Sequence, residues 1–478
     1  MRKPNILLVC ADMASAEHFG CYGNPAGITP NIDGIAARGT LFEQAYCPCP
    51  PCIPARASMM SGLYGHTHGK IAHLKMRLTP RPQLIPEILS RNGYRTGLVG
   101  KTHWWPSADS LGCNDAFLTI DDHLTPELGK NDAYIRYLEA EGLFAYDEKT
   151  WEQEKEHLHP DRLPFESLKV NWTARQTCKL LEEYSAARDP FFLFCSFVEP
   201  HGSRKAPKQY LEKMQQISLP AIIGRSGEHN DKPDVQRRAV KGWAAKPQKK
   251  EAYRRGVYAG IGLVDQCIGT ILETFQKLNL SENTVVLLLT DHGDLMYDHG
   301  CVEKTFLYEQ AIRIPLLIAG PGIPSGARRS HLVSQIDLLP TILDLCSIDV
   351  DSLRVDGRSV LPIISDPKSP WRDKLFAEVD QTVHLKDLVS ASQAKMIRQG
   401  PWKYIYTLID GHRVEEELYN LEEDPQELHN IAGRPAQADR TQKLRSEILR
   451  WMVATEVRRL HPEPENHYQV PSINTDFL

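Results

Sequence analysis

Near its beginning the chain reads Asn5-Ile-Leu-Leu-Val-Cys-Ala-Asp12, an apolar run that ends at a carboxylate. A short apolar run bounded by polar residues is typical of a buried strand in a parallel sheet. Comparable runs stand at residues 96–99, 191–197 and 285–290, and helical patterns lie between them. This alternation predicts an α/β fold with buried parallel strands.

The clearest helical pattern precedes the last of these runs. Its apolar residues, spaced three or four apart, are Val257, Ile261, Val264, Ile268, Leu272 and Phe275. They form one apolar stripe, which predicts a long helix packed against the sheet. Asp12 and Asp291 each follow a predicted strand directly, at the carboxyl ends where open α/β sheets bind their ligands.

Composition limits the partners that the chain can have. Its 478 residues include 56 Lys and Arg against 61 Asp and Glu, a formal net charge of −5, and 41% are hydrophobic. This mild acidic excess argues against nucleic acid as a partner. No apolar run reaches the roughly 18–20 residues that span a bilayer, so no membrane association is expected.

The N-terminus and the cysteines indicate a compartment. Arg2 and Lys3 precede the first apolar run, but that run is short and has no small-residue cleavage site after it, so a signal peptide is not expected. Most of the eleven cysteines stand alone in apolar surroundings, as reduced core thiols do. We therefore expect a cytoplasmic location.

The pattern changes near residue 366. Short alternating strands are predicted around residues 375–379, 395–398, 402–406 and 417–421, followed by a helix that carries Leu444, Ile448, Trp451 and Met452. We predict a large α/β domain over residues 1–365, a small C-terminal α+β domain over 366–461 and a tail over 462–478. Either disorder or packing on a neighbouring subunit would account for the tail, whose apolar residues are Tyr468, Val470 and Phe477.

Two long segments between strands, residues 104–164 and 202–250, are predicted to be insertions of the kind that form lids or rims. The second, with the residues just after it, carries the basic side chains Arg237, Arg238, Lys241, Lys246, Lys249, Lys250, Arg254 and Arg255. A solvated helix face is the favoured interpretation of these charges, and an anion-attracting rim is the alternative.

The most informative stretch for chemistry is Cys47-Pro-Cys-Pro-Pro-Cys52-Ile-Pro54-Ala-Arg56-Ala-Ser-Met-Met-Ser61-Gly62. Cys49 and Cys52 have the spacing of a zinc or redox pair. No second pair stands at a matching distance to complete a zinc site, and a thioredoxin-like motif would open a helix in a much smaller domain. Both uses are therefore disfavoured.

Cys52-x-Pro54-x-Arg56 with the trailing Ser61-Gly62 resembles the signature of the formylglycine-dependent sulfatases, a family of the alkaline phosphatase superfamily. Further matches extend the resemblance over most of the chain, namely Pro4-Asn5, Thr29-Pro30-Asn31-Ile-Asp33, Gly93-Tyr94, Gly100-Lys101-Thr-His103, Pro200-His201, Thr290-Asp291-His292-Gly293, Leu418-Tyr419-Asn420-Leu421 and Asp424-Pro425. The resemblance implies an alkaline-phosphatase-like fold, in which helices flank a large central mixed, mostly parallel sheet.

The resemblance also implies covalent catalysis. In that family a formylglycine-generating maturation enzyme oxidises the cysteine, here Cys52, to an aldehyde. The hydrated aldehyde is a geminal diol, of which one hydroxyl attacks the sulfur of a sulfate ester and the other later expels sulfate. One divalent metal ion, calcium or manganese, would lower the pKa of the diol. The implied metal ligands are Asp12, Asp291, His292 and Cys52.

The other roles are implied by matching positions. Arg56 would hold the modified residue, and Lys101 and Lys304 would bind and neutralise the sulfuryl group. His103 would be the base that acts on the diol, and His201 would bind the sulfate and protonate the leaving alcohol. The remaining histidines close to the signature, interpreted as rim or structural residues, are His66, His68 and His73.

Two positions depart from the most frequent sulfatase pattern. Met13 stands where most members have a second acidic residue, and His292 stands in place of an asparagine. Two carboxylates, one imidazole and the diol suit manganese, iron or zinc better than calcium. The Asp291-His292 pair followed by Lys304 resembles the branch of phosphonate monoester hydrolases and choline sulfatases. Members of that branch are cytoplasmic and oligomeric, so we expect a homo-oligomer.

Three hypotheses follow for function. The leading one is a sulfuric ester hydrolase acting on a small-molecule sulfate monoester, either a sulfated metabolite or a sugar. The second is a phosphonate monoester or phosphodiester hydrolase that uses the same site. The third is a non-catalytic oxyanion- or metal-binding protein that keeps Cys52 as a thiol. Residues that could seat a cationic or sugar leaving group are Trp104, Trp105, Asp121, Asp122 and Trp151.

Overall fold

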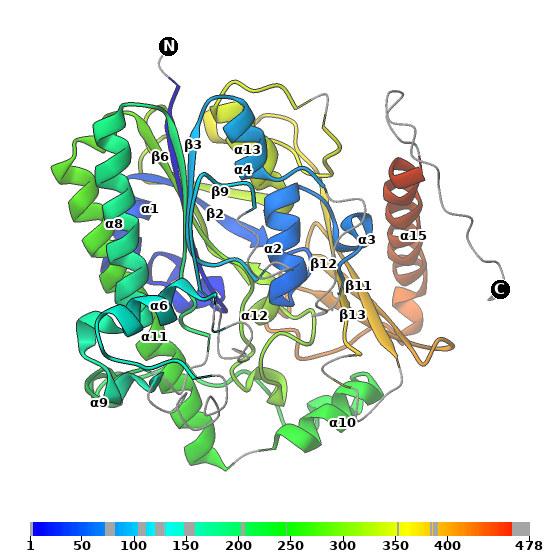
Figure 1. The fold of residues 1–478 in the computed structure, drawn as a ribbon. Coiled ribbons are helices and arrows are strands. Elements are labelled where there is room, and N and C mark those ends of the chain that lie inside the picture. Colours follow the sequence, from blue (N-terminus) through cyan, green and yellow to red (C-terminus); the bar gives the residue numbers. More distant parts are fainter. Residues whose placement is uncertain are drawn as a thin grey trace.

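A nine-stranded sheet forms the centre of the molecule (Figure 1). The structure, a computed structural model, describes residues 3–71, 82–103, 111–119, 129, 131–147, 158–201, 206–244, 246–350, 353–382, 385 and 391–460. Eight strands follow one another across the sheet as β4 (Asp115–Thr119), β3 (Arg95–Lys101), β5 (Phe191–Ser196), β1 (Asn5–Ala11), β6 (Thr284–Thr290), β8 (Leu316–Ala319), β2 (Gly39–Tyr46) and β7 (Arg313–Ile314), and β9 (Ala327–Ser334) pairs with β2.

Strand direction is constant over the first five strands and alternates beyond them, across β8, β2 and β7. The first five strands, from β4 to β6, are parallel, whereas β8 is antiparallel to both β6 and β2. The predicted central mixed, mostly parallel sheet is therefore confirmed, as are the four predicted strands within it. The strand predicted from the opening run coincides with β1.

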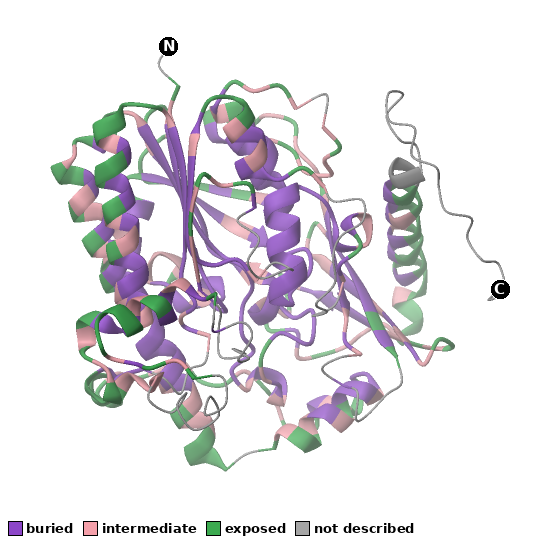
Figure 2. Cartoon of the chain, viewed as in Figure 1, coloured by how far each residue is buried: buried purple, intermediate pink, exposed green. Residues whose placement is uncertain are grey.

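Helices cover both faces of this sheet. One face carries α1 (Pro30–Ala37), α8 (Lys169–Ala187) and α11 (Pro247–Lys277), and the other carries α2 (Cys52–Ser61), α4 (Ile85–Arg91), α13 (Leu338–Leu345) and α14 (Leu361–Ser365). Leu7 and Val9 of β1 pack into the first layer, and Ile6 and Leu8 pack into the second, as the two-residue period of a strand requires. Figure 2 shows the buried sheet between these layers. The predicted long helix is confirmed as part of α11.

The prediction that residues 104–164 form only an insertion is wrong. This segment contains β4, the edge strand of the main sheet, and the helix α6 (Ala133–Ala140). The side chain of Asp132 caps the N-terminus of α6. The sequence does not predict β4 because its five residues, DAFLT, are mostly half-exposed and lack a long apolar run. The segment 202–250 contains α9 (Lys208–Gln215) and α10 (Asp234–Trp243) and extends into α11.

Three of the basic residues predicted in and just after this segment lie in two kinds of environment. Arg237 and Arg238 form ion pairs with Asp234 on α10, as solvated helix residues do. Arg254 is instead buried and donates to the carbonyl of Pro220 at 2.5 Å. A solvated face therefore describes the first two residues and not Arg254.

The C-terminal part is a second, antiparallel sheet. Its strands, in spatial and chain order, are β10 (Lys374–Asp380), β11 (Ser392–Gln399), β12 (Trp402–Ile409) and β13 (Arg413–Asn420), and α15 (Ala438–Leu460) follows. Leu444, Ile448 and Trp451 of α15 pack on one face of this sheet, beside which the helix stands in Figure 1. The predicted strands and helix are confirmed, while the domain division at residue 365 stays a prediction.

The predicted tail, with Tyr468, Val470 and Phe477, lies outside the described residues. Among the described helices, none combines the length and the apolar composition needed to cross a membrane.

Candidate active site

Four buried side chains converge at the carboxyl ends of the parallel strands. Asp12 follows β1 and Asp291 follows β6, and the strand register pairs Ala11 with Thr290, so the two carboxylates lie side by side. Cys52 begins α2 and, with His292, completes a group whose potential ligand atoms all lie within 4.8 Å of one another. In the part of the chain that the structure describes, this is the single such group.

The orientation of His292 is fixed by a backbone carbonyl. Its Nδ1 lies 2.9 Å from the oxygen of Gly293, and because a carbonyl only accepts, Nδ1 carries the proton. Nε2 therefore presents a lone pair, 3.0 Å from Cys52 Sγ and 3.6 Å from Asp12 Oδ1. Burial lowers the pKa of His292, which favours the neutral ring that metal binding requires.

Arg56, one turn of α2 beyond Cys52, joins the ends of three strands. Its Nε donates to Asp291 Oδ2 at 2.8 Å, after β6. One terminal nitrogen donates to the Lys101 carbonyl of β3 and to Ser196 Oγ of β5, both at 2.7 Å. The guanidinium is buried, so these protein acceptors replace its water shell and fix the base of the site.

Lys101, the last residue of β3, forms an ion pair with Asp12 Oδ2. Gly100 permits this placement, because its φ is +99° and a Cβ there would lie 1.9 Å from the Ser196 carbonyl oxygen. Burial alone would raise the pKa of Asp12, but the charges of Lys101, His201 and Arg56 hold it well below its usual range. Asp12 is therefore ionised.

Lys304, in the segment after β6, reaches the same site. Its Nζ lies 3.9 Å from Met13 Sδ. Burial alone would lower the pKa of Lys304, but the neighbouring Cys52, Glu303 and Asp12 raise it, so the ammonium is charged. Met13 contributes through its backbone, because its N–H donates to Asp291 Oδ1 at 3.1 Å.

The thiol of Cys52 is protonated at neutral pH. Burial and then the charge of Asp12 raise the pKa of Cys52 to about 12. A thiol that holds its proton is a weak nucleophile. The cysteine itself is therefore poorly suited to attack an ester.

The two histidines predicted for proton transfer lie on segments that leave the sheet. His103 is two residues beyond β3 and has a φ of +52°. His201 follows β5, where its N–H donates to the carbonyl of Val198 at 3.1 Å, and its charge contributes to the low pKa of Asp12. Their roles as base and acid stay predictions.

His66 and His68 make structural contacts. The two ring nitrogens of His66 lie 2.7 Å from Glu378 Oε1 and 2.6 Å from Thr455 Oγ1, which links α3 (Gly65–His68) to the C-terminal sheet and α15. His68 Nε2 lies 3.0 Å from Ser58 Oγ. The other predicted candidates lie outside the described residues, namely His73, Trp104, Trp105, Asp121, Asp122 and Trp151.

The sequence does not predict two residues that support the site. Ser196 Oγ accepts from Arg56 and donates to the Lys101 carbonyl at 2.6 Å, and its place at the end of a predicted strand was the available signal. Gln335 Nε2 donates to the carbonyls of Thr290 and Asp291, at 2.8 and 2.7 Å. No pattern in the sequence connects Gln335 to the end of β6.

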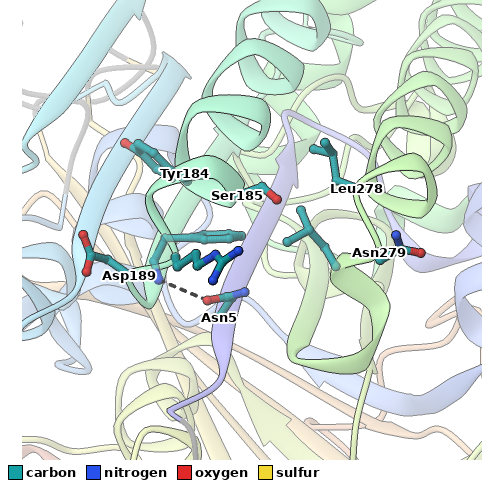
Figure 3. A pocket seen from close by; sticks show the side chains of 9 residues that line it. Asn5, Tyr184, Ser185, Asp189, Leu278 and Asn279 are labelled. Atoms are coloured by element: carbon teal, nitrogen blue, oxygen red, sulfur yellow. Dashed lines mark hydrogen bonds between the residues drawn. The ribbon is translucent and has the colours of Figure 1, made fainter.

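A surface pocket of 460 Å³ lies at the amino ends of the parallel strands, at the other end of the sheet from the converging group (Figure 3). Asn5 at the start of β1, Phe191 at the start of β5 and Leu280 before β6 line it, together with Tyr184. The pocket contains none of the four converging residues, because these follow the carboxyl ends of the same strands.

Comparison with known proteins defines the class of protein. The family model described as "Sulfatase" matches residues 4–348, and the model described as "N-sulphoglucosamine sulphohydrolase, C-terminal" matches residues 297–454. The chain belongs to the sulfatase family and is an enzyme of that class. The first match contains every member of the converging group.

Individual relatives agree with the predicted branch. An arylsulfatase of Clostridium perfringens is 28% identical over 94% of both chains, and a choline-sulfatase of Rhizobium meliloti is 28% identical over 91% of this chain and 83% of its own. The solved phosphonate monoester hydrolase of Agrobacterium radiobacter superposes with a TM-score of 0.79 at 22% identity, over 95% of this chain and 96% of its own. The predicted alkaline-phosphatase-like fold is confirmed.

Proposed function

We propose that the protein hydrolyses a sulfate monoester of a small molecule, a sulfated metabolite or sugar, through a formylglycine made from Cys52. The observation that carries this proposal is the convergence of Asp12, Cys52, Asp291 and His292 on one buried point. Lys101 and Lys304 add positive charge around it, which suits a tetrahedral anion. These two lysines bind the sulfuryl oxygens in the proposed mechanism.

The hydrated aldehyde at position 52 supplies two hydroxyl groups. One loses its proton to solvent and attacks sulfur while the bond between sulfur and the alcohol oxygen breaks. The departing alcohol receives a proton from His201, which regains a proton from solvent. The second hydroxyl then loses its proton to His103, and the carbon–oxygen bond to sulfate breaks, which restores the aldehyde and releases sulfate. Water rehydrates the aldehyde.

The residues of the converging group fit a divalent metal. Lys101 pairs with Asp12 Oδ2, so Asp12 offers its Oδ1. Both oxygens of Asp291 accept hydrogen bonds, Oδ2 from Arg56 and Oδ1 from two backbone N–H groups, so the metal would share one of them. With His292 Nε2 and position 52, the chain supplies four donors, one of them an imidazole. Calcium takes six to eight oxygens, whereas manganese, iron and zinc accept this set, so manganese is the metal we propose. When bound, it would acidify the attacking hydroxyl.

Maturation and location complete the proposal. A formylglycine-generating enzyme, with an external oxidant, would convert Cys52. None of the eleven cysteines, all of them described, forms a disulfide, which supports a reducing compartment such as the cytoplasm. A homo-oligomer remains part of the proposal.

A phosphonate monoester or phosphodiester hydrolase is the second candidate. The phosphonate monoester hydrolase fold matches along nearly the whole chain, and Met13 and His292 depart from the common sulfatase pattern. Both substrates place a tetrahedral anion at the same point, so the pocket for the second substituent decides between them.

The test compares kcat/KM for an aryl sulfate and an aryl phosphonate monoester, using enzyme matured at Cys52 and reconstituted with manganese or, separately, calcium. We expect the sulfate to be preferred, with manganese the better metal. Preference for the phosphonate would replace the proposal by the second candidate.

A non-catalytic binding protein with an unmodified thiol is the third candidate. The mass of the peptide that contains Cys52 distinguishes it, because conversion removes one sulfur and two hydrogens and adds one oxygen. After co-expression with a maturation enzyme, we expect the lighter peptide. Recovery of the thiol alone would contradict the catalytic proposal.

A further inference from the structure

The segment between His292 and Lys304 has an unusual backbone. Four of its residues other than glycine have left-handed φ angles, namely Met296 (44°), Tyr297 (72°), His299 (54°) and Glu303 (60°). Such conformations are unfavourable for side chains with a Cβ, so surrounding contacts must hold them. Glu303, the last of them, immediately precedes Lys304, and its conformation therefore sets the direction in which Lys304 leaves the backbone.

Asp294 closes this segment into a loop. The buried carboxylate accepts from the N–H of Met296 at 3.1 Å and from the N–H of Glu303 at 2.9 Å, both through Oδ1. Beside it, the N–H of Leu295 donates to the carbonyl of Glu303 at 2.8 Å. One side chain thus joins the beginning of the loop to the residue before Lys304.

Tyr253 fixes Asp294 from another element. Its hydroxyl donates to Asp294 Oδ2 at 2.7 Å, which leaves Oδ1 for the loop. Tyr253 lies near the start of α11, and Val257 and Ile261, one and two turns further on, are buried in the main core. The helix that carries the Tyr253 hydroxyl is therefore held in place by the core on one face of the main sheet. The Tyr253 ring also packs edge-on against Tyr297 within the loop, with the ring centroids 5.7 Å apart.

We infer that Tyr253 and Asp294 form a positioning pair, which holds Glu303 in its left-handed conformation and so directs the Lys304 ammonium at the anionic group of the substrate. This inference rests on the proposed function for the role of Lys304. Neither residue belongs to the converging group, and Tyr253 comes from α11, which begins at the end of the 202–250 segment, rather than from any matched motif. The pair acts through Lys304 and does not touch the substrate.

The experiment is a double-mutant cycle in the matured, manganese-loaded enzyme with an aryl sulfate. Tyr253→Phe removes the hydroxyl and keeps the ring, and we expect kcat/KM to fall about tenfold, the loss of one hydrogen bond to a charged group. In a Lys304→Ala background, the same change should have no further effect, because the residue through which it acts is gone.

The matched control is Tyr184→Phe. Tyr184 is buried and Tyr253 is partly buried, and the Tyr184 hydroxyl likewise donates to an aspartate, Asp115 Oδ2, at 2.8 Å. Tyr184 lines the pocket at the amino ends of the parallel strands, at the other end of the sheet from the converging group (Figure 3). We expect its kcat/KM to equal that of the wild type. Hydrogen exchange supplies a readout without turnover, since Tyr253→Phe, and not Tyr184→Phe, should speed exchange at the amides of Met296 and Glu303.

Each outcome separates the inference from the proposed function. An equal loss in the wild-type and Lys304→Ala backgrounds, or unchanged exchange in Tyr253→Phe, would overturn the positioning pair. Full activity of Lys304→Ala would overturn the role of Lys304 in the proposed function and, with it, the purpose of the pair. Inactive but fully matured wild type would contradict the proposed function, and the exchange comparison would still decide whether the pair holds the loop.

Discussion

Replacement of Asp291 by asparagine tests whether this residue both stabilises the folded protein and binds the metal. Asp291 Oδ1 accepts from the N–H groups of Met13 and His292, and Oδ2 accepts from Arg56 Nε. An asparagine has one acceptor oxygen, so its amide NH₂ must face either two backbone donors or the guanidinium. Both arrangements bring donors together and leave the buried Arg56 charge without its nearest anion.

The cost follows from these contacts. Removal of one partner from a buried ion pair costs about 3–5 kcal/mol of unfolding free energy. Asp265→Asn is the matched control, because Asp265 is equally buried and accepts from the N–H groups of Asn31 and Ile32, at 3.1 and 2.9 Å, without an arginine. We expect this control to lose about 1–3 kcal/mol, the cost of an impaired buried hydrogen-bonding group.

The assay is urea unfolding of the three proteins with and without manganese. A metal that binds only the folded state adds about 2.7 kcal/mol when its concentration is one hundred times its Kd. We expect this increment in the wild type and in Asp265→Asn, and no increment in Asp291→Asn at the same concentration. An unchanged increment in Asp291→Asn would refute the assignment of Asp291 as a ligand, whatever its effect on stability without metal.

Three further predictions test the site and its support. Cys52→Ala should reduce kcat/KM to the background rate and keep most of the manganese-dependent stabilisation, measured by the same unfolding assay, because both carboxylates and the imidazole remain. Gly100→Ala should lower the melting temperature and activity strongly, since its Cβ would meet the Ser196 carbonyl at 1.9 Å, whereas Gly93→Ala, also left-handed but with nothing within 4 Å, should cost only about 1 kcal/mol. Burial opposes ionisation of Glu378, but Lys395 and His66 lower its pKa from 4.5 to about 2. The ionised carboxylate therefore contributes fully to the free energy of unfolding above pH 4.5, and this contribution disappears as the pH falls to 2. Urea unfolding should therefore show a smaller difference between wild type and Glu378→Gln at pH 3 than at pH 7, and equal differences would contradict this linkage.

Sequence patterns predicted four adjacent strands of the main sheet, β1, β3, β5 and β6, because these central strands are buried on both faces. Each central strand must then be an apolar run, which is visible locally, as in β1 and β6. The edge strand β4 is half-exposed and has no such run, so the sequence could not distinguish it from a loop. Its place depends on pairing with β3, a contact between segments that no local pattern describes.

The candidate ligands were predicted for a related reason. Asp12 and Asp291 follow apolar runs directly, and the motif around Cys52 has fixed spacing, so all of them are visible in the sequence. Ser196 and Gln335 support the site through hydrogen bonds to backbone carbonyls of other strands. A serine or glutamine takes on that function only through its neighbours, which the sequence does not reveal.

By itself, the sequence determined which chemical groups this protein has and where its strands end, because both are properties of short stretches of chain. Only the tertiary structure decided that these groups meet. Asp12 and Asp291 lie together because β1 and β6 pair in register, and Arg56 reaches three strand ends because α2 packs across them. The tertiary structure also decided the protonation states of these groups, since burial keeps the Cys52 thiol protonated while Lys101 keeps Asp12 ionised. Both effects depend on charges and solvent exclusion brought about by distant segments.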